Sequence, residues 1–285
     1  MTTAADLARP DFELPDLTRR WGGVRRLYGD AGLAKLQVAH IVVVGIGGVG
    51  SWAAEALARN AVGVITLIDL DNIAESNFNR QLHAVNGSIG KPKVSAMRER
   101  ILSINPSCKV TEIEDFVTPE NIEKLLNFQM HGQIHGIVDC VDDAPAKAAV
   151  AAFCKTKNIP LVMAGGAGGR LDPTRIKTDD LAQVHHDKLL AKVRHILRAD
   201  YSYPKGSDSA KKTLKMNVAC VYSDEPAMMP LRGDLDAAAS DAQLTSCDVE
   251  SSSITGLNCA GYGSSVCVTA PMGFAAAALV INQLL

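Results

Sequence analysis

A glycine-rich turn between a strand and a helix sets the strongest limit on how this chain can fold. Residues 42–60 read VVVGIGGVGSWAAEALARN, a β-branched run that breaks into G-x-G-x-x-G and continues with helix-forming residues. Glycines at this spacing let the backbone approach phosphate oxygens at the positive end of the following helix. We therefore expect a nucleotide-binding turn, made by Gly45, Gly47, Gly48 and Gly50.

The first half of the chain alternates short apolar runs with helix-like stretches. The apolar runs are β-branched, which predicts strands buried on both faces; they are His40–Val44, Val64–Asp69, Lys109–Ile113, Gly136–Asp139 and Pro160–Met163. Helices are expected at Val49–Asn60, Lys91–Ile104, Pro119–Leu126, Ala144–Lys157 and Asp187–Tyr201, and a further strand at Thr174–Thr178. The alternation predicts an α/β fold with a doubly wound, mostly parallel, Rossmann-like sheet and a C-terminal extension.

Composition argues against several classes of protein. A formal net charge of −2 over 285 residues gives no general attraction to nucleic acid or membrane. The seven cysteines include no C-x-x-C pair, so we expect neither a disulfide framework nor a structural zinc, and we expect a cytoplasmic location. Residues 265–285 are apolar and long enough to span a bilayer, but they lack basic flanks. A helix packed on the sheet is therefore expected without stable membrane insertion, and peripheral membrane association is the alternative.

The second half of the chain carries two segments of opposite charge. Residues 187–215 hold eight Lys and Arg against three acids, and residues 224–250 hold seven acids against one Arg. The acidic segment is also poor in large apolar residues, which is typical of a mobile loop, expected here at about 224–260.

The residues after the second expected strand bear on the type of nucleotide. They read LIDLDNIAESNFNRQ at 67–81 and are followed by GKPK at 90–93. The glycine turn with Asp69 alone fits an NAD-dependent oxidoreductase equally well. A nicotinamide cofactor, however, has one pyrophosphate, which the turn already serves, so the extra cations Arg80 and Lys93 favour a triphosphate. Asp142, which follows another parallel strand in DCVD, suits Mg²⁺.

Together with INP at 104–106, these motifs resemble the ubiquitin-activating-enzyme-like adenylyltransferases of the ThiF, MoeB and HesA type over about residues 18–170. The resemblance implies an enzyme that adenylates a carboxylate with ATP and Mg²⁺ and then passes the acyl group to a nucleophile. It also implies a homodimer in which an N-terminal arginine reaches the partner's ATP. By motif, it implies Asp69 and Asp71 at the ribose, Asn77, Arg80 and Lys93 at the phosphates, Asp142 at magnesium and Arg20 as the arginine that crosses the dimer.

Three further stretches are similar to one branch of that family, the bacterial tRNA threonylcarbamoyladenosine dehydratases. They are RRWGGVRRLYGDAGLAKL at 19–36, GGAGGRLDPTRI at 165–176 and ACVYSDEP at 219–226. This resemblance implies adenylation of the threonyl carboxylate in a modified tRNA adenosine, followed by ring closure through an internal nitrogen. Arg80, Lys93 and Asp142 would be the catalytic residues. It implies one adenylation domain over 1–285, with a nucleotide-binding core at 18–170 and a substrate-binding extension at 171–285.

If the substrate is a tRNA, we expect the basic residues of 187–215 to bind its phosphates. The candidates are Lys188, Lys192, Arg194, Arg198, Lys211 and Lys212. A sulfur-transfer partner of the cysteine desulfurase system is also considered. Three alternatives stay open. One is activation of the C-terminus of a sulfur-carrier or ubiquitin-like protein, for which Cys247 or Cys259 could form a thioester. The others are NAD-dependent oxidation or reduction and a non-catalytic scaffold that keeps only the fold.

Overall fold

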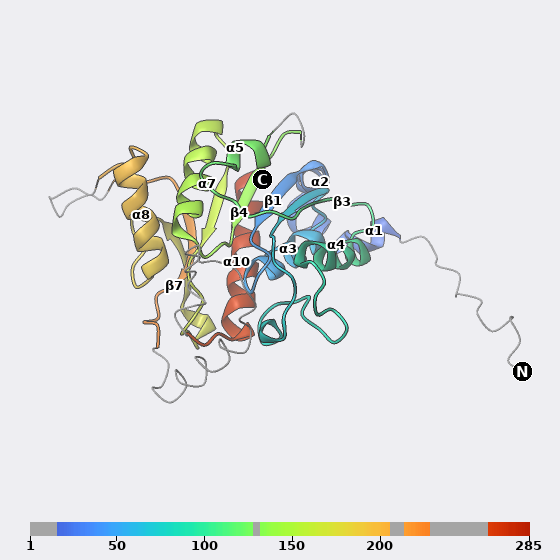
Figure 1. Ribbon diagram of the computed structural model, residues 1–285. Helices are drawn as coiled ribbons and strands as arrows, with labels where there is room; N and C mark the ends of the chain where they lie inside the picture. The colour runs from blue at the N-terminus through green and yellow to red at the C-terminus, as the bar shows by residue number, and fades with distance from the viewer. Residues whose placement is uncertain (1–15, 128–131, 206–213, 229–261) are drawn as a thin grey trace, which may run out of the picture.

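The computed structural model describes residues 16–127, 132–205, 214–228 and 262–285. Within them, seven strands form one sheet in the order β3-β2-β1-β4-β5-β7-β6 (Figure 1). All neighbouring strands are parallel except β6 and β7, which are antiparallel. The strands are β1 (His40–Val44), β2 (Val64–Ile68), β3 (Lys109–Ile113), β4 (Gly136–Asp139), β5 (Leu161–Ala164), β6 (Ile176–Asp180) and β7 (Ala219–Ser223). The expected mostly parallel, doubly wound sheet is confirmed.

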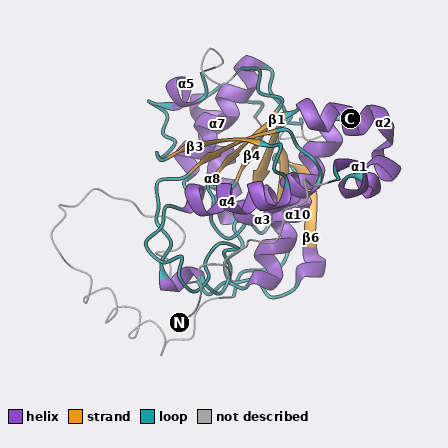
Figure 2. Cartoon of the chain, turned by 90° about the vertical axis from the view of Figure 1, so that its right-hand side faces the viewer, coloured by secondary structure: helices purple, strands orange, loops and turns teal. Residues whose placement is uncertain are grey.

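Helices cover both faces of the sheet, with α5 and α7 on one side and α3, α4 and α10 on the other (Figure 2). The side chains of α8 join the core of the α7 face, and those of α2 join the core of the α10 face. The helices are α1 (Leu17–Arg20), α2 (Gly22–Val38), α3 (Gly50–Arg59), α4 (Lys93–Ile104), α5 (Ile122–Leu125), α7 (Ala144–Lys157), α8 (Lys188–Asp200) and α10 (Val266–Leu284), with 3-10 turns η1 (Glu75–Asn77) and η2 (Pro173–Arg175).

The direction of winding reverses between β1 and β4, which are neighbours in the sheet. Val44 at the end of β1 lies opposite Ile68 at the end of β2 and opposite Asp139 at the end of β4. The three strands therefore end at one level, and the residues that follow them meet at one edge. In doubly wound sheets, ligands bind in the crevice at this switch point.

The apolar C-terminal stretch forms α10, which is long and apolar enough to span a bilayer by length and composition, with half of its most apolar window buried in the protein. It packs along α3, and Phe274 makes an edge-to-face contact with Trp52 at a centroid distance of 5.8 Å. Figure 1 shows α10 running through the middle of the molecule. The expectation of a helix packed on the sheet is confirmed.

Helices α1 and α2 and strand β7 are not expected from the sequence. Four glycines obscure the helical pattern of α2, and Gly29 interrupts it with a φ of 73°. What holds α2 is tertiary contact: Leu36 is fully buried, and Lys35 Nζ donates to the Leu285 carbonyl at 3.0 Å. Tertiary packing can outweigh a weak local helix signal.

The helix expected at 119–126 is shorter in the structure, and the strand expected at 174–178 is shifted by two residues. The helix expected at 119–126 is only α5, because the Asn121 side chain accepts from Thr118 N and donates to the Phe116 carbonyl, which forms a turn before it. Strand β6 begins at Ile176 because η2 precedes it. Most of the loop expected at 224–260 lies outside the described residues, as do Lys211, Lys212, Cys247 and Cys259.

We predict that Gly273→Ala destabilises the protein by about 1–3 kcal/mol, the usual effect of overpacking a core. A Cβ at Gly273 would lie 2.5 Å from the Val49 carbonyl oxygen and 2.8 Å from Trp52 Cβ, so α10 would have to move away from α3. Gly23→Ala is the matched control, since a Cβ there meets nothing within 4 Å and alanine favours the helix. Equal urea midpoints for the two variants would contradict the prediction.

Candidate active site

A cavity of about 830 Å³ opens at the switch point of the sheet. One end is lined by the turns that follow β1, β2 and β4, and the other by the turn after β5 and the start of α8. Its walls therefore combine the glycine turn with two stretches that are far away in the sequence. Eight of the expected site residues line it: Gly45, Gly47, Gly48, Asp69, Asp71, Arg80, Lys93 and Asp142.

The glycine turn is packed too closely to accept side chains at two positions. Gly45 has a φ of +83°, and a Cβ there would lie 2.9 Å from the Cys140 carbonyl carbon of the adjoining strand end. A Cβ at Gly50 would lie 1.8 Å from the Gly45 carbonyl oxygen. Gly50 is thus needed for the contact between helix and turn and does not line the cavity, whereas Gly47 and Gly48 do.

Asp69 braces the glycine turn. Its Oδ2 accepts from the Ile46 N–H at 2.6 Å and its Oδ1 accepts from the Asp71 N–H at 2.9 Å. Burial raises the pKa of Asp69, and the nearby Lys93 ammonium opposes this shift. Lys93 Nζ lies 2.6 Å from Asp71 Oδ2 and 3.9 Å from Asp69 Oδ1. The two carboxylates therefore hold a lysine ammonium at the cavity wall.

Arg80 is held by its neighbours at the same wall. Its Nη1 donates to the Ser76 carbonyl at 2.8 Å and to Asn79 Oδ1 at 3.0 Å. Burial lowers the pKa of Arg80, and the charge of Asp142 opposes that shift. A cation and an exposed carboxylate thus lie within electrostatic reach of each other beside the glycine turn.

A buried ion pair fixes the turn that presents Asp142. Lys147 Nζ lies 3.2 Å from Asp139 Oδ1, and both side chains are fully buried. Asp139 Oδ1 also accepts from the Val141 N–H at 3.1 Å. Burial raises the pKa of Asp139, whereas Lys147 opposes the shift. Asp139 is therefore part of the scaffold. Asp142 and Asp143 both line the cavity, and the Asp143 side chain also accepts from the Ala146 N–H at the start of α7.

Asn77 and Arg20 are not brought to the cavity of their own chain. The Asn77 side-chain oxygen accepts from the Ala74 N–H at 3.1 Å and shapes the turn that leads to Arg80. Arg20 Nη1 donates to the Ile104 carbonyl at 2.8 Å, at the end of α4. Asn77 thus braces this turn, and its contact with phosphate stays a prediction.

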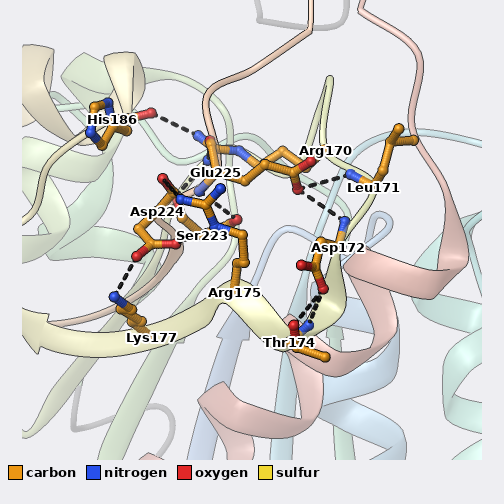
Figure 3. A network of polar contacts seen from close by, with 10 residues as sticks. All are labelled: Arg170, Leu171, Asp172, Thr174, Arg175, Lys177, His186, Ser223, Asp224 and Glu225. Carbon is orange, nitrogen blue, oxygen red and sulfur yellow. Dashed lines mark hydrogen bonds and ion pairs between the residues drawn. The ribbon is translucent and has the colours of Figure 1, made fainter.

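The far end of the cavity depends on Arg170, which the sequence did not single out. Its guanidinium is buried and donates to the main-chain carbonyls of His186, Ser223 and Glu225. Figure 3 shows the guanidinium between these segments, with the Glu225 carboxylate accepting from the Leu171 and Asp172 N–H groups. Arg170 therefore joins the turn after β5 to the start of α8 and the end of β7. The only advance signal was its place after GGAGG.

Burial disfavours the thiolate form of the cysteine that lines the cavity. Cys140 lines the cavity, but burial raises its pKa to about 12. Burial also raises the pKa of Cys108 to about 12, and it raises the pKa values of Cys154 and Cys220. Nucleophilic attack by cysteine requires the thiolate, so these residues are structural.

Among the residues that the structure describes, no group of three or more His, Cys, Asp and Glu is placed to hold a metal by itself. Magnesium commonly binds through one or two carboxylates together with substrate phosphates and water. The exposed Asp142 at the cavity fits that pattern, because phosphates bound at the glycine turn and Arg80 would supply the remaining oxygen ligands.

The model of the ThiF family matches residues 22–229, well over half of the chain. The chain belongs to the ThiF family. It is 41% identical over 268 residues to the tRNA threonylcarbamoyladenosine dehydratase of Escherichia coli K12 and 44% identical to that of Haemophilus influenzae, in each case over 94% of both chains. The crystal structure of the E. coli dehydratase in complex with ATP matches with a TM-score of 0.78 and 40% identity, over 95% of this chain and 96% of that chain. An AMP complex of the same dehydratase matches with a TM-score of 0.77.

We predict that Lys147→Met destabilises this ThiF-family chain by about 3–5 kcal/mol, because it leaves Asp139 buried without its cation. Lys157→Met is the control: Lys157 forms an exposed ion pair with Glu123 at 3.6 Å, and such pairs contribute at most about 1 kcal/mol. Urea unfolding followed by circular dichroism measures both. A Lys147 variant as stable as the Lys157 variant would refute a structural role for the buried pair.

Proposed function

We propose that this chain catalyses the ATP-dependent dehydration of threonylcarbamoyladenosine in tRNA, by adenylating the threonyl carboxylate and closing a ring within the same side chain. The observation that carries the proposal is the single cavity of about 830 Å³, which is lined both by the glycine turn with Arg80, Lys93 and Asp142 and by the turn after β5 with the start of α8. The similarity to dehydratases over 94% of both chains, and to an ATP complex of one of them, supports it.

Each polar group at the nucleotide end has a part in adenylation. Arg80 and Lys93 offset the negative charge of the phosphates and of the pyrophosphate as it leaves. Asp142 would hold Mg²⁺, which when bound neutralises charge on the triphosphate. Asp69 and Asp71 keep Lys93 in place and lie at the cavity for contact with the ribose.

Ring closure needs no second substrate. Adenylation replaces a poor leaving group, oxide, by AMP. The attacking nitrogen belongs to the same side chain, so it is present at a high effective concentration. When the nitrogen–carbon bond forms, the bond to AMP breaks and the nitrogen releases its proton. The overall change is loss of one water, driven by cleavage of ATP to AMP and pyrophosphate, and no thiol takes part.

The basic face of α8 supports binding of a tRNA. Lys188 and Lys192 are exposed, and Lys188 also lines the cavity. Arg194 and Arg198 have other partners: Arg194 donates to the carbonyls of Leu181 and Val184, and Arg198 donates to that of Pro204. We therefore assign the phosphate contacts of this helix to the two lysines.

The alternatives are less well supported. The molybdopterin-synthase adenylyltransferase of Salmonella typhimurium is 32% identical, but over only half of this chain. An NAD-dependent oxidoreductase has no use for Arg80, Lys93 and Asp142 beside the glycine turn.

We further infer one domain over 1–285 with the nucleotide-binding part at 18–170, and a cytoplasmic homodimer. A sulfur-transfer partner stays a prediction.

We predict that Arg80→Ala and Asp142→Asn each lower ATP-dependent ring closure by about 10²-fold or more, since each removes one preorganised charge at the leaving pyrophosphate. Neither variant should unfold, because both side chains lie in the crevice and not in the core. Arg98→Ala and Asp30→Asn, on exposed surfaces, are the controls. Mass spectrometry of threonylcarbamoylated tRNA measures the product, and near-normal turnover in both site variants would reject the ATP-site assignment.

We predict that Arg20 serves the site of the other subunit. Heterodimers of Arg20→Ala and Arg80→Ala chains, co-expressed with different tags and purified through both, should then keep about half of the wild-type activity, because one of the two sites is intact. If Arg20 acted in its own chain, or if the protein were monomeric, no such activity would appear. Heterodimers of Arg80→Ala and Asp142→Asn chains are the control and should stay inactive, since both of their sites are damaged.

A further inference from the structure

Two buried oxygen atoms in the cavity wall have no hydrogen-bond partner among the described residues. They are Oε1 of Gln81 and Oγ1 of Thr269. Both residues line the cavity, with relative exposures of 6% for Gln81 and 2% for Thr269. Buried polar atoms are nearly always paired in native proteins, so an unpaired one in a binding cavity indicates a ligand that supplies the missing partner.

The side chains of Gln81 and Thr269 both lie close to the Gly47–Gly48 part of the glycine turn. A Cβ at Gly48 would lie 3.4 Å from Thr269 Cγ2, and one at Gly47 would lie 4.0 Å from Gln81 Nε2. Gln81 directly follows Arg80, and Thr269 belongs to the first turns of α10. Two segments that are far apart in the sequence thus place polar side chains beside the glycine turn.

The main chain around Gln81 and Thr269 forms its hydrogen bonds without using either of these side chains. The main chain near Gln81 is held by its own N–H, which donates to the Asn77 carbonyl, and by Leu82 N, which donates to Ser51 Oγ. The main-chain N–H of Thr269 donates to the Ser265 carbonyl. Among the described residues, the fold therefore makes no use of the two side-chain oxygens.

The chemistry of the unpaired atoms excludes phosphate as the partner of Gln81 Oε1. A carbonyl oxygen accepts hydrogen bonds only, and an ionised phosphate has no hydrogen to donate. The threonylcarbamoyl group does: its carbonyl joins the threonine nitrogen to the adenine nitrogen, so the linkage carries two N–H donors near a carboxylate. The amide nitrogen of Gln81 lies on the side of the glycine turn, which leaves its oxygen for such a donor.

We propose that Gln81 and Thr269 bind the threonylcarbamoyl group during adenylation and ring closure, an inference that rests on the function proposed above. Gln81 Oε1 accepts from the N–H group attached to adenine, the nitrogen whose attack gives a five-membered ring. The Thr269 hydroxyl donates to an oxygen of the threonyl carboxyl group. When that nitrogen bonds to the carboxyl carbon, the electron pair of the broken bond leaves with AMP and the nitrogen's proton goes to solvent.

The test uses the full-length protein and the variants Gln81→Met and Thr269→Val. Each should lower single-turnover ring closure by about 10-fold or more, the effect of losing one hydrogen bond to the reacting group. Affinity for ATP in the absence of tRNA, measured by calorimetry, should stay within about 2-fold of wild type. Thr269→Val should also melt at the same temperature as wild type or higher, because it replaces an unpaired buried hydroxyl by a methyl of similar shape.

Matched controls separate this role from a structural one. Thr269→Ser keeps the hydroxyl and should recover most of the activity lost in Thr269→Val. Thr111→Val and Gln37→Met alter an exposed threonine and an exposed glutamine that do not line the cavity; both should close the ring at the wild-type rate.

Three results would overturn the inference while the proposed function stands. Both site variants could close the ring at the normal rate. The variants could instead lose enough affinity for ATP to explain their loss of activity, or they could melt at a lower temperature and lose activity in proportion. A wild-type protein that forms neither cyclic product nor pyrophosphate from modified tRNA and ATP would instead overturn the proposed function, and this inference with it.

Discussion

The close contact between the glycine turn and the end of β4 is the constraint on which the site depends. Gly45 lies against the Cys140 main chain, and the start of α3 at Gly50 lies against the Gly45 carbonyl. Any side chain at these positions would push the strand ends apart. Because β1 and β4 are adjacent and end at one level, this contact also sets the distance between the turn and Asp142. Backbone packing therefore fixes the position of Asp142 relative to the glycine turn.

Ion pairs with neighbouring carboxylates and lysines hold the fixed charges around this contact. Lys93 is held by Asp69 and Asp71, and the turn of Asp142 is held by the buried pair of Asp139 and Lys147. Groups positioned in this way need little reorganisation when negative charge develops. Such sites carry a cost in stability, which is visible here in the unpaired oxygens of Gln81 and Thr269 and in the burial of Arg170.

The second end of the cavity is assembled from segments far apart in the chain. Gly169, at a φ of +71°, donates its N–H to the Gly263 carbonyl and accepts from the Met228 N–H through its own carbonyl. Arg170 then ties the same turn to the start of α8 and the end of β7 (Figure 3). The GGAGGR stretch thus acts as a junction, and the residues at 262–264 enter the cavity wall through it.

Much of this protein follows from local patterns in its sequence. The five parallel strands of the first half, the helices between them and the glycine turn follow from β-branched runs and from glycine spacing, because strand burial and phosphate approach depend on neighbouring residues. The same holds for Asp69 and Asp142, which follow strand ends, and for Arg80 and Lys93, which lie in the motifs after β2. Tertiary structure alone decided the rest. Helix α2 is held by contacts with the C-terminus, and Arg170, Gln81 and Thr269 meet one cavity from three distant places. Such meetings depend on how separate elements pack, and no spacing along the chain encodes them.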